Sequence, residues 1–139
     1  MLKLILFLFT LFISIIQAKD YNFDSRGFSK QSTISFNDDS KYTQLETVGW
    51  WTDSRGNYGT EKCFGKIEVI KDEIKLDILC ELIDQVNNKL RVSRKRNSLE
   101  GGGVGINTYL ETSARYKDLL NKKCTYAVTN LKENFFYKQ

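Results

Sequence analysis

The chain has 139 residues and a formal net charge of +4, and it contains no histidine and no proline. The absence of histidine excludes Ser-His-Asp and Cys-His nucleophile systems, histidine-ligated zinc and a histidine general base. Three cysteines without a Cys-x-x-Cys pair make a poor metal site, so we expect no metal, no cofactor and no catalytic residue. The weak positive charge, with no dense basic stripe, does not favour nucleic acid as a partner.

Residues 1–18 have the three-part pattern of a secretory signal peptide. A short basic start at Lys3 precedes an apolar run over residues 4–16, and charged residues begin directly after Ala18. Ile16 and Ala18 occupy the two positions that a signal peptidase reads. The run is shorter than the ~20 apolar residues that span a bilayer, although an uncleaved anchor is the alternative. The pattern predicts a periplasmic or secreted protein with no integral membrane segment after cleavage.

Residues 19–30 are expected to form a flexible N-terminal arm, and residues 31–139 a single domain. Within that domain, apolar and polar positions alternate over short segments, which is the pattern of half-buried strands. No long helical stripe is present, and residues 116–120 fit one helical turn. Eight strands are predicted, over residues 32–36, 43–51, 62–70, 73–83, 89–96, 104–110, 123–131 and 134–138.

The hairpin over residues 62–83 has the clearest alternation. A two-residue turn beginning at Lys71 sets a register in which Cys63 faces Cys80 at a non-hydrogen-bonded position, where the strands approach most closely. In an exported protein this geometry predicts a disulfide between Cys63 and Cys80, with Cys124 left over. A bond from Cys124 to either partner is the alternative.

Eight antiparallel strands in a small exported domain predict an all-β fold. The expected architecture is a closed up-and-down barrel, with a β-sandwich as the alternative. The glycine cluster over residues 101–105 is not a phosphate-binding loop, because no Lys-Ser or Lys-Thr follows it and no helix pattern opens after it. Glycines at a strand entrance permit sharp bending or close backbone approach in a barrel.

The densest group of aromatic and polar residues surrounds one predicted turn. Aromatic side chains with polar tips commonly hold sugars or other small ligands, so the candidate ligand site comprises Trp50, Trp51, Arg55 and Tyr58. A purely structural hairpin is the favoured alternative, because turn chemistry accounts for the small and polar residues between them. Trp50 and Trp51 are consecutive in a strand, so one must point inward and the other outward.

A basic run follows in the fifth predicted strand. Alternation places Arg91 and Lys95 on one face and Arg94 and Arg96 on the other. Because the charges are divided between two faces, the run favours a solvated hairpin. Docking to anionic lipid headgroups or to polysaccharide is the alternative.

Several segments carry a resemblance to a known family: Val104-Gly105-Ile106, Arg115-Tyr116-Lys117-Asp118-Leu119-Leu120, Lys123-Cys124-Thr125-Tyr126, Cys63-Phe64-Gly65 and Cys80-Glu81. Together they resemble barrels related to allene oxide cyclase. The resemblance implies an eight-stranded barrel with a lumen. The chain departs from the family pattern at Thr112, Ala114 and Asn121, where glycine is expected, and no catalytic residue of the cyclases carries over by position.

These observations predict a non-enzymatic exported barrel of the cell envelope. It would bind a small apolar or amphipathic ligand in its lumen or an envelope protein partner at its rim, or serve as a structural component without a small ligand. The alternative is a lumen-based isomerase or cyclase that acts on a small apolar substrate, and its only support is the resemblance in fold. Convergent polar groups around a cavity would favour an enzyme, whereas a filled or purely apolar lumen would not.

Overall fold

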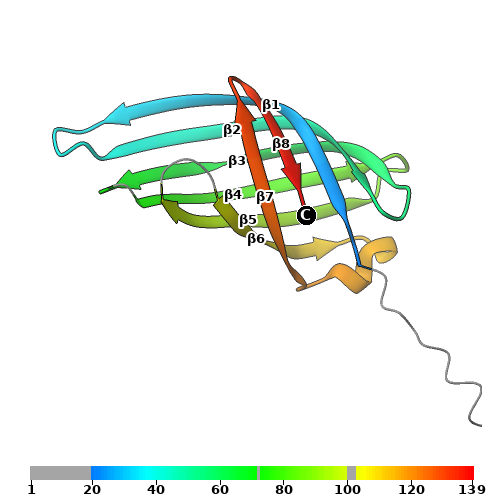
Figure 1. The fold of residues 1–139 in the computed structure, drawn as a ribbon. Coiled ribbons are helices and arrows are strands. Elements are labelled where there is room, and N and C mark those ends of the chain that lie inside the picture. Colours follow the sequence, from blue (N-terminus) through cyan, green and yellow to red (C-terminus); the bar gives the residue numbers. More distant parts are fainter. Residues whose placement is uncertain (1–19, 72, 100–102) are drawn as a thin grey trace, which may run out of the picture.

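Eight antiparallel strands follow one another around a closed barrel in chain order, and the last strand pairs back onto the first (Figure 1). A computed structural model describes residues 20–71, 73–99 and 103–139. The all-β, closed up-and-down prediction is therefore confirmed. The elements are β1 Phe23–Ser35, β2 Lys41–Asp53, β3 Tyr58–Ile70, β4 Glu73–Asp84, β5 Lys89–Leu99, β6 Gly103–Thr112, the 3-10 helix η2 Ala114–Leu119, β7 Lys123–Leu131 and β8 Asn134–Lys138.

The β3–β4 hairpin has the register that its alternation predicts. Cys63 lies opposite Cys80 and the two form a disulfide, as expected. Their sulfur atoms are buried in the barrel lumen. Cys124 is the free cysteine, and its half-buried side chain points toward the core. Burial raises the pKa of the Cys124 thiol, although Lys122 opposes the shift.

The first strand begins earlier than the sequence predicts. A flexible arm over residues 19–30 is wrong from Phe23 onward, because β1 starts there and pairs with both β2 and β8. The inward positions of this segment are mostly small, and Gly27 lies against the backbone at Val48, so an apolar alternation is not visible. Phe23 lies in the core, and Tyr21, just before the strand, packs against it. The predicted signal peptide, residues 1–18, lies outside the described residues.

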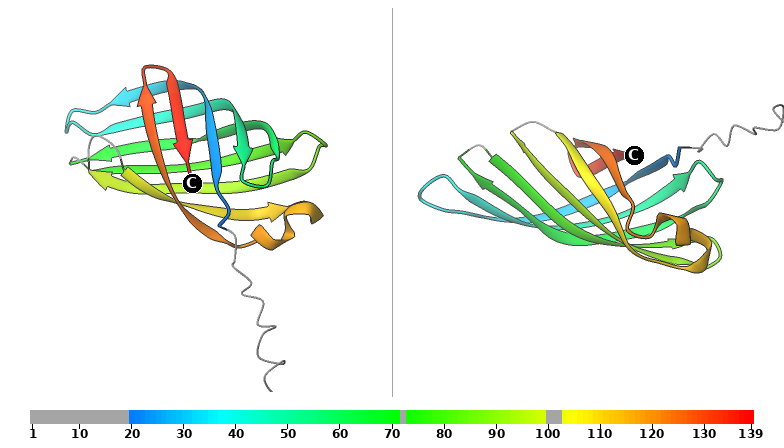
Figure 2. Two further views of the ribbon diagram at one scale, coloured as in Figure 1. Left: turned by 45° about the vertical axis from the view of Figure 1, so that its right-hand side comes forward. Right: turned by 90° about the horizontal axis from the view of Figure 1, so that it is seen from below.

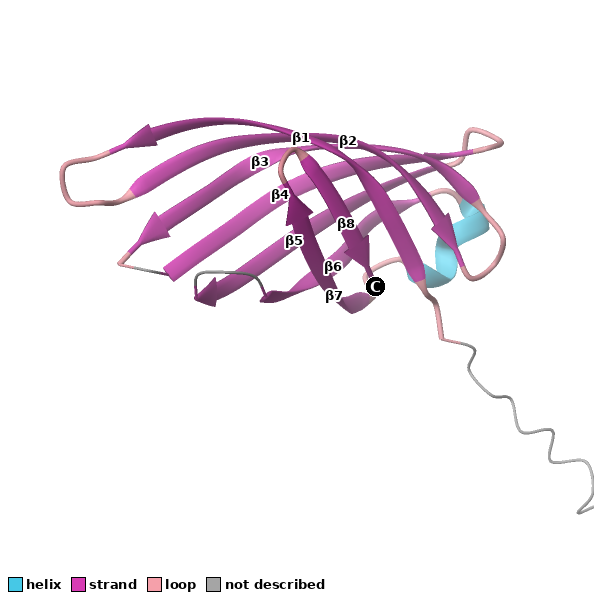
Figure 3. Cartoon of the chain, turned by 45° about the horizontal axis from the view of Figure 1, so that its top comes forward, coloured by secondary structure: helices cyan, strands magenta, loops and turns pink. Residues whose placement is uncertain are grey.

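The wall of the barrel is taller on one side than on the other. β1 and β2 each have 13 residues, whereas β8 has 5. The β1–β2 hairpin therefore extends well past the β7–β8 pair, which crosses the barrel diagonally (Figures 1 and 3). η2 lies at the opposite end of the barrel, beside the β2–β3 and β4–β5 turns (Figure 2). The two ends of the lumen consequently have different surroundings.

Alternate residues of the strands fill the lumen. The core combines aliphatic side chains with a large share of aromatic ones, among them Phe23, Trp51, Tyr109, Tyr126 and Tyr137. None of the helices in the described part of the chain is long and apolar enough to cross a membrane.

Candidate functional site

The end of the barrel that holds η2 is closed by large side chains. Tyr116 and Leu119 of η2 are buried, and the Tyr116 hydroxyl donates to Asp84 Oδ2 at 2.9 Å. Trp51 is 1% exposed, and its indole Nε1 donates to the carbonyl oxygen of Thr60 at 3.0 Å. The polar tips of these aromatic side chains thus have partners inside the protein, as buried polar groups require.

Two turns at this closed end use the same aspartate–asparagine arrangement. Asp53 Oδ1 accepts from the backbone N–H of Asn57 at 2.8 Å, and Asn57 Nδ2 donates back to Asp53 Oδ2 at 2.8 Å. Asp84 and Asn88 repeat both hydrogen bonds, at 2.8 and 2.9 Å. Arg115 of η2 donates to Asn57 Oδ1 at 2.6 Å and ties the helix to the first turn. This end of the barrel is sealed by connected polar groups.

The hydrogen bonds at Asp84 keep its carboxyl ionised. Burial acts to raise the pKa of this carboxyl, but hydrogen bonds from Asn88, Val86 and Tyr116 outweigh it and hold the pKa below its ordinary value. A carboxylate that accepts several N–H and O–H donors is stabilised in its charged form.

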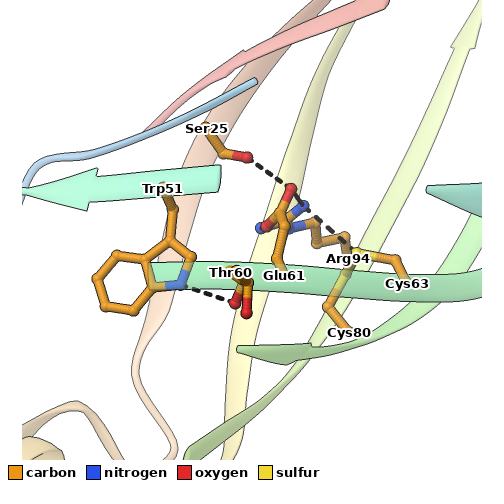
Figure 4. Close-up of a disulfide and its surroundings, with 7 residues drawn as sticks. All are labelled: Ser25, Trp51, Thr60, Glu61, Cys63, Cys80 and Arg94. Atoms are coloured by element: carbon orange, nitrogen blue, oxygen red, sulfur yellow. Dashed lines mark hydrogen bonds and ion pairs between the residues drawn. A yellow bond between two sulfur atoms is a disulfide. The ribbon is translucent and has the colours of Figure 1, made fainter. Parts of the chain in front are cut away.

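The middle of the lumen contains a buried ion pair between Glu61 of β3 and Arg94 of β5 (Figure 4). Arg94 Nη2 donates to Glu61 Oε2 at 2.7 Å, and the Ser25 hydroxyl donates to Glu61 Oε1 at 2.6 Å. Both charged side chains lie next to the disulfide, with Arg94 Nη1 3.8 Å from Cys63 Sγ. Burial acts to lower the pKa of Arg94, but the charge of Glu61 outweighs it and the pKa lies above its ordinary value.

Stacked aromatic rings extend from this ion pair toward the end of the barrel opposite η2 (Figure 2), which we call the open end. The Arg94 guanidinium lies 4.0 Å above the ring of Tyr137, a cation–π contact. Tyr137 in turn stacks on Tyr126, with ring centroids 4.8 Å apart. The ring of Tyr126 lies directly over Gly105 of β6, where a Cβ atom would collide with it. Gly105 of the glycine cluster thus permits a close approach, as its position near a strand entrance indicated, whereas Gly101 and Gly102 lie outside the described residues.

A cavity of about 60 Å³ lies beyond these rings, at the open end of the barrel. Its walls are apolar on the side of β2, β3 and β4, where Leu45, Ile67, Leu76 and Ile78 line it. Polar side chains line the other side, among them Arg96 of β5 and Tyr126 of β7. A volume of this size corresponds to roughly two waters, at about 30 Å³ each, or to the end of a small ligand.

Two of these polar side chains have atoms that are buried without a partner. Arg96 Nε and Nη1 and the Tyr126 hydroxyl have no hydrogen-bond partner among the described residues. Burial raises the pKa of Tyr126, although Arg96 and Arg94 both oppose the shift, so the hydroxyl keeps its proton at neutral pH. Buried polar groups normally have partners, so these atoms mark a position where a ligand or ordered water fits.

Of the four predicted site residues, Trp50 and Trp51 both line one surface groove, which Arg55 and Tyr58 do not line. Trp51 lies in the core, whereas Trp50 is 55% exposed on the outer face, so one tryptophan points inward and one outward as alternation predicts. Arg55 forms an ion pair with Asp118 of η2, in which Arg55 Nη1 lies 3.0 Å from Asp118 Oδ1. Tyr58 is exposed on the outside of β3. Ligand contact by Trp50 stays a prediction.

The basic run of β5 divides between the two faces as predicted, but the interpretation as a solvated hairpin is wrong for one face. Arg91 and Lys95 point outward, where they pair with Glu111 and Asp77. Arg94 and Arg96 point into the lumen. The signal that could have located them was present in the alternation, since the same face of β5 carries the apolar core residues Leu90 and Val92.

Over the described residues, no group of three or more His, Cys, Asp or Glu side chains is placed to hold a metal ion. Comparisons of the chain with known protein families, with curated proteins and with solved structures give no match.

Proposed function

We propose that this protein is an exported binding protein, and that the open end of its barrel takes up one end of a small amphipathic ligand. The observation that carries the proposal is the cavity at this end, where apolar walls face polar atoms without partners. Ligand pockets typically combine an apolar lining with a few polar groups that fix orientation. The remainder of the lumen is filled by side chains, so the rest of such a ligand would lie along the tall wall.

The tall wall offers a suitable surface for an apolar chain. Beyond the β7–β8 pair, the inner face of β2, β3 and β4 continues without a strand opposite it (Figure 3). Ile67 and Val69 of β3 and Ile74 of β4 are only half-buried on this face. An alkyl chain that covered them would be stabilised by about 0.8 kcal/mol for each CH₂ group removed from water.

A lumen-based isomerase or cyclase is the second candidate. Its support is the convergence of polar groups, including a tyrosine that remains protonated and can donate. Among the described residues, those that line the cavity include no carboxylate and no cysteine. A base would therefore have to come from the ligand or from water, which is why we rank binding first.

Calorimetric titration with amphiphiles of equal chain length tests the proposal. We expect at least one of decanoate, decanol and decyltrimethylammonium to bind the folded protein with 1:1 stoichiometry. Leu76→Trp would fill the cavity and abolish this binding, whereas Leu79→Trp, on the exposed outer face of the same strand, would leave it intact. Equal binding by both variants, or no binding of any amphiphile, would contradict the proposal. Recovery of a chemically altered ligand would favour the isomerase.

A further inference from the structure

The two arginines that point into the lumen from β5 have different surroundings. Arg94 has its charge balanced by Glu61 at 2.7 Å. Arg96, two residues further toward the open end, has no carboxylate within 4 Å among the described residues, and two of its nitrogens are buried without a partner. At the open end of the barrel, Arg96 therefore carries a positive charge that no carboxylate of the described residues balances in an ion pair.

Tyr126 adds a second unpartnered donor on the same side of the cavity. Its side chain is 3% exposed, and its hydroxyl has no hydrogen-bond partner in the described part of the chain. Gly103 of β6 packs closely against β5, since a Cβ there would lie 2.8 Å from Ser98 Cβ and 3.3 Å from Arg96 Cδ. Arg96 and Tyr126 line the same cavity. The site thus consists of buried hydrogen-bond donors of Arg96 and Tyr126 that line the cavity, with apolar side chains across from them.

On this basis we infer that the group of the ligand that binds at the open end is an oxyanion. It is a carboxylate, held by Arg96 and by the hydroxyl of Tyr126. The inference rests on the proposed function and specifies its ligand. A guanidinium can only donate hydrogen bonds, so the complementary group must supply acceptor oxygens. A partly buried cation without a counter-charge is costly, and a ligand anion removes that cost. An alcohol would leave the charge unbalanced, and an ammonium head would add a second positive charge.

The size of the cavity selects among oxyanions. Its volume of about 60 Å³ accommodates a planar carboxylate and the first carbons of its chain. A phosphate ester is bulkier and carries more charge than one arginine balances. The predicted ligand class is therefore a single-chain carboxylic acid, with its chain leaving along β2, β3 and β4.

The head-group preference and its dependence on Arg96 provide the test. We expect decanoate to bind about tenfold more tightly than decanol, the effect of one charge-assisted interaction. Arg96→Met should remove this preference and leave decanol binding unchanged. Lys95→Met, which changes the adjacent outward-facing residue, should keep the preference. Tyr126→Phe should weaken the binding of decanoate by a few fold and leave the binding of decanol unchanged.

The outcomes separate the two proposals. Equal binding of decanoate and decanol to the unaltered protein would overturn the carboxylate inference while the proposed function stands. A preference for decanoate that survives Arg96→Met would overturn the assignment of Arg96. Tighter binding of decyl phosphate than of decanoate would replace the carboxylate by a phosphate. If no amphiphile binds, the proposed function itself fails.

Discussion

At the closed end of the barrel, η2 and two aspartate-centred turns provide partners for Asn57, Asn88 and Tyr116, whereas at the open end buried atoms of Arg96 and Tyr126 line a cavity and have no partner among the described residues. The same eight strands thus serve two different purposes. Satisfied polar networks rigidify a structure, and unsatisfied buried groups cost stability and are retained where function needs them. We therefore expect the stability of the fold to depend on the closed end and the middle of the lumen. We expect ligand binding to depend on the open end.

The largest expected effect is at Trp51 of the closed end. Trp51→Ala removes a buried ring and its hydrogen bond to the Thr60 carbonyl, and should lower the free energy of unfolding by about 4 kcal/mol. The matched control is Trp50→Ala on the outer face, which should change it by no more than about 0.5 kcal/mol. Urea denaturation measures both. Equal losses would show that the outer tryptophan also stabilises the barrel.

The second effect concerns the ion pair that separates the two ends. Glu61→Gln leaves Arg94 buried without a counter-charge and should cost about 3 kcal/mol in unfolding free energy. Glu46→Gln is the control, because Glu46 pairs only with Lys62 on the outer face. A double variant, Glu61→Leu with Arg94→Met, should recover most of the loss. If Glu61→Gln behaved like the control, the pair would contribute nothing and the lumen would tolerate an unpaired arginine anywhere.

A smaller and pH-dependent effect is expected at the turn around Asp84. Asp84→Asn weakens hydrogen bonds from Asn88 and Tyr116 and should cost about 1.5 kcal/mol at neutral pH. Because the pKa of Asp84 is lowered in the folded state, its contribution is present above the unfolded pKa of about 4 and is lost as the pH falls through the folded pKa.

Acid titration of stability measures that contribution. The unaltered protein should lose stability below about pH 4 more steeply than Asp84→Asn does. Asp77→Asn, on the outer face of the same strand, should follow the unaltered protein. Parallel acid curves for all three proteins would show that the closed end does not depend on this carboxylate.

The smallest effect should come from the open end. Arg96→Met should not lower the free energy of unfolding and should raise it slightly, since it removes a cation with two buried nitrogens that have no partner among the described residues. Arg94→Met, by contrast, leaves Glu61 in the lumen without its ion-pair partner and should destabilise the protein strongly. A large loss with Arg96→Met would mean that the open end is structural, and would break the contrast between the two ends.

Much of the barrel could be predicted from alternation alone. The register around Lys71 correctly paired Cys63 with Cys80, because a two-residue turn leaves only one arrangement that keeps both apolar faces inward. The start of β1 was missed because Gly27 and Ser25 face inward there without an apolar signature. Small residues at such positions are selected by the proximity of neighbouring strands, and a single sequence does not reveal that proximity.

The residues of the candidate site were harder to predict from the sequence than the fold. Alternation placed Arg94 and Arg96 on one face, yet charge alone favoured a solvated surface for them. Their burial depends on Glu61, on the rings of Tyr126 and Tyr137 and on the short β8, all distant in the chain. Such long-range partners follow from the closure of the barrel, which local patterns do not specify.

The pairing of β1 with β8 has a consequence for how the molecule is assembled. Every other pairing joins strands that are consecutive in the chain, but the second edge of β1 pairs with β8, a five-residue strand whose residues lie more than one hundred positions after their partners. Until β8 arrives, the growing sheet has two unpaired edges, and such edges invite association with other chains. A chain delivered residue by residue therefore passes through an open, adhesive intermediate. Refolding yield should depend on protein concentration and on the integrity of β8, even where the finished barrel is stable.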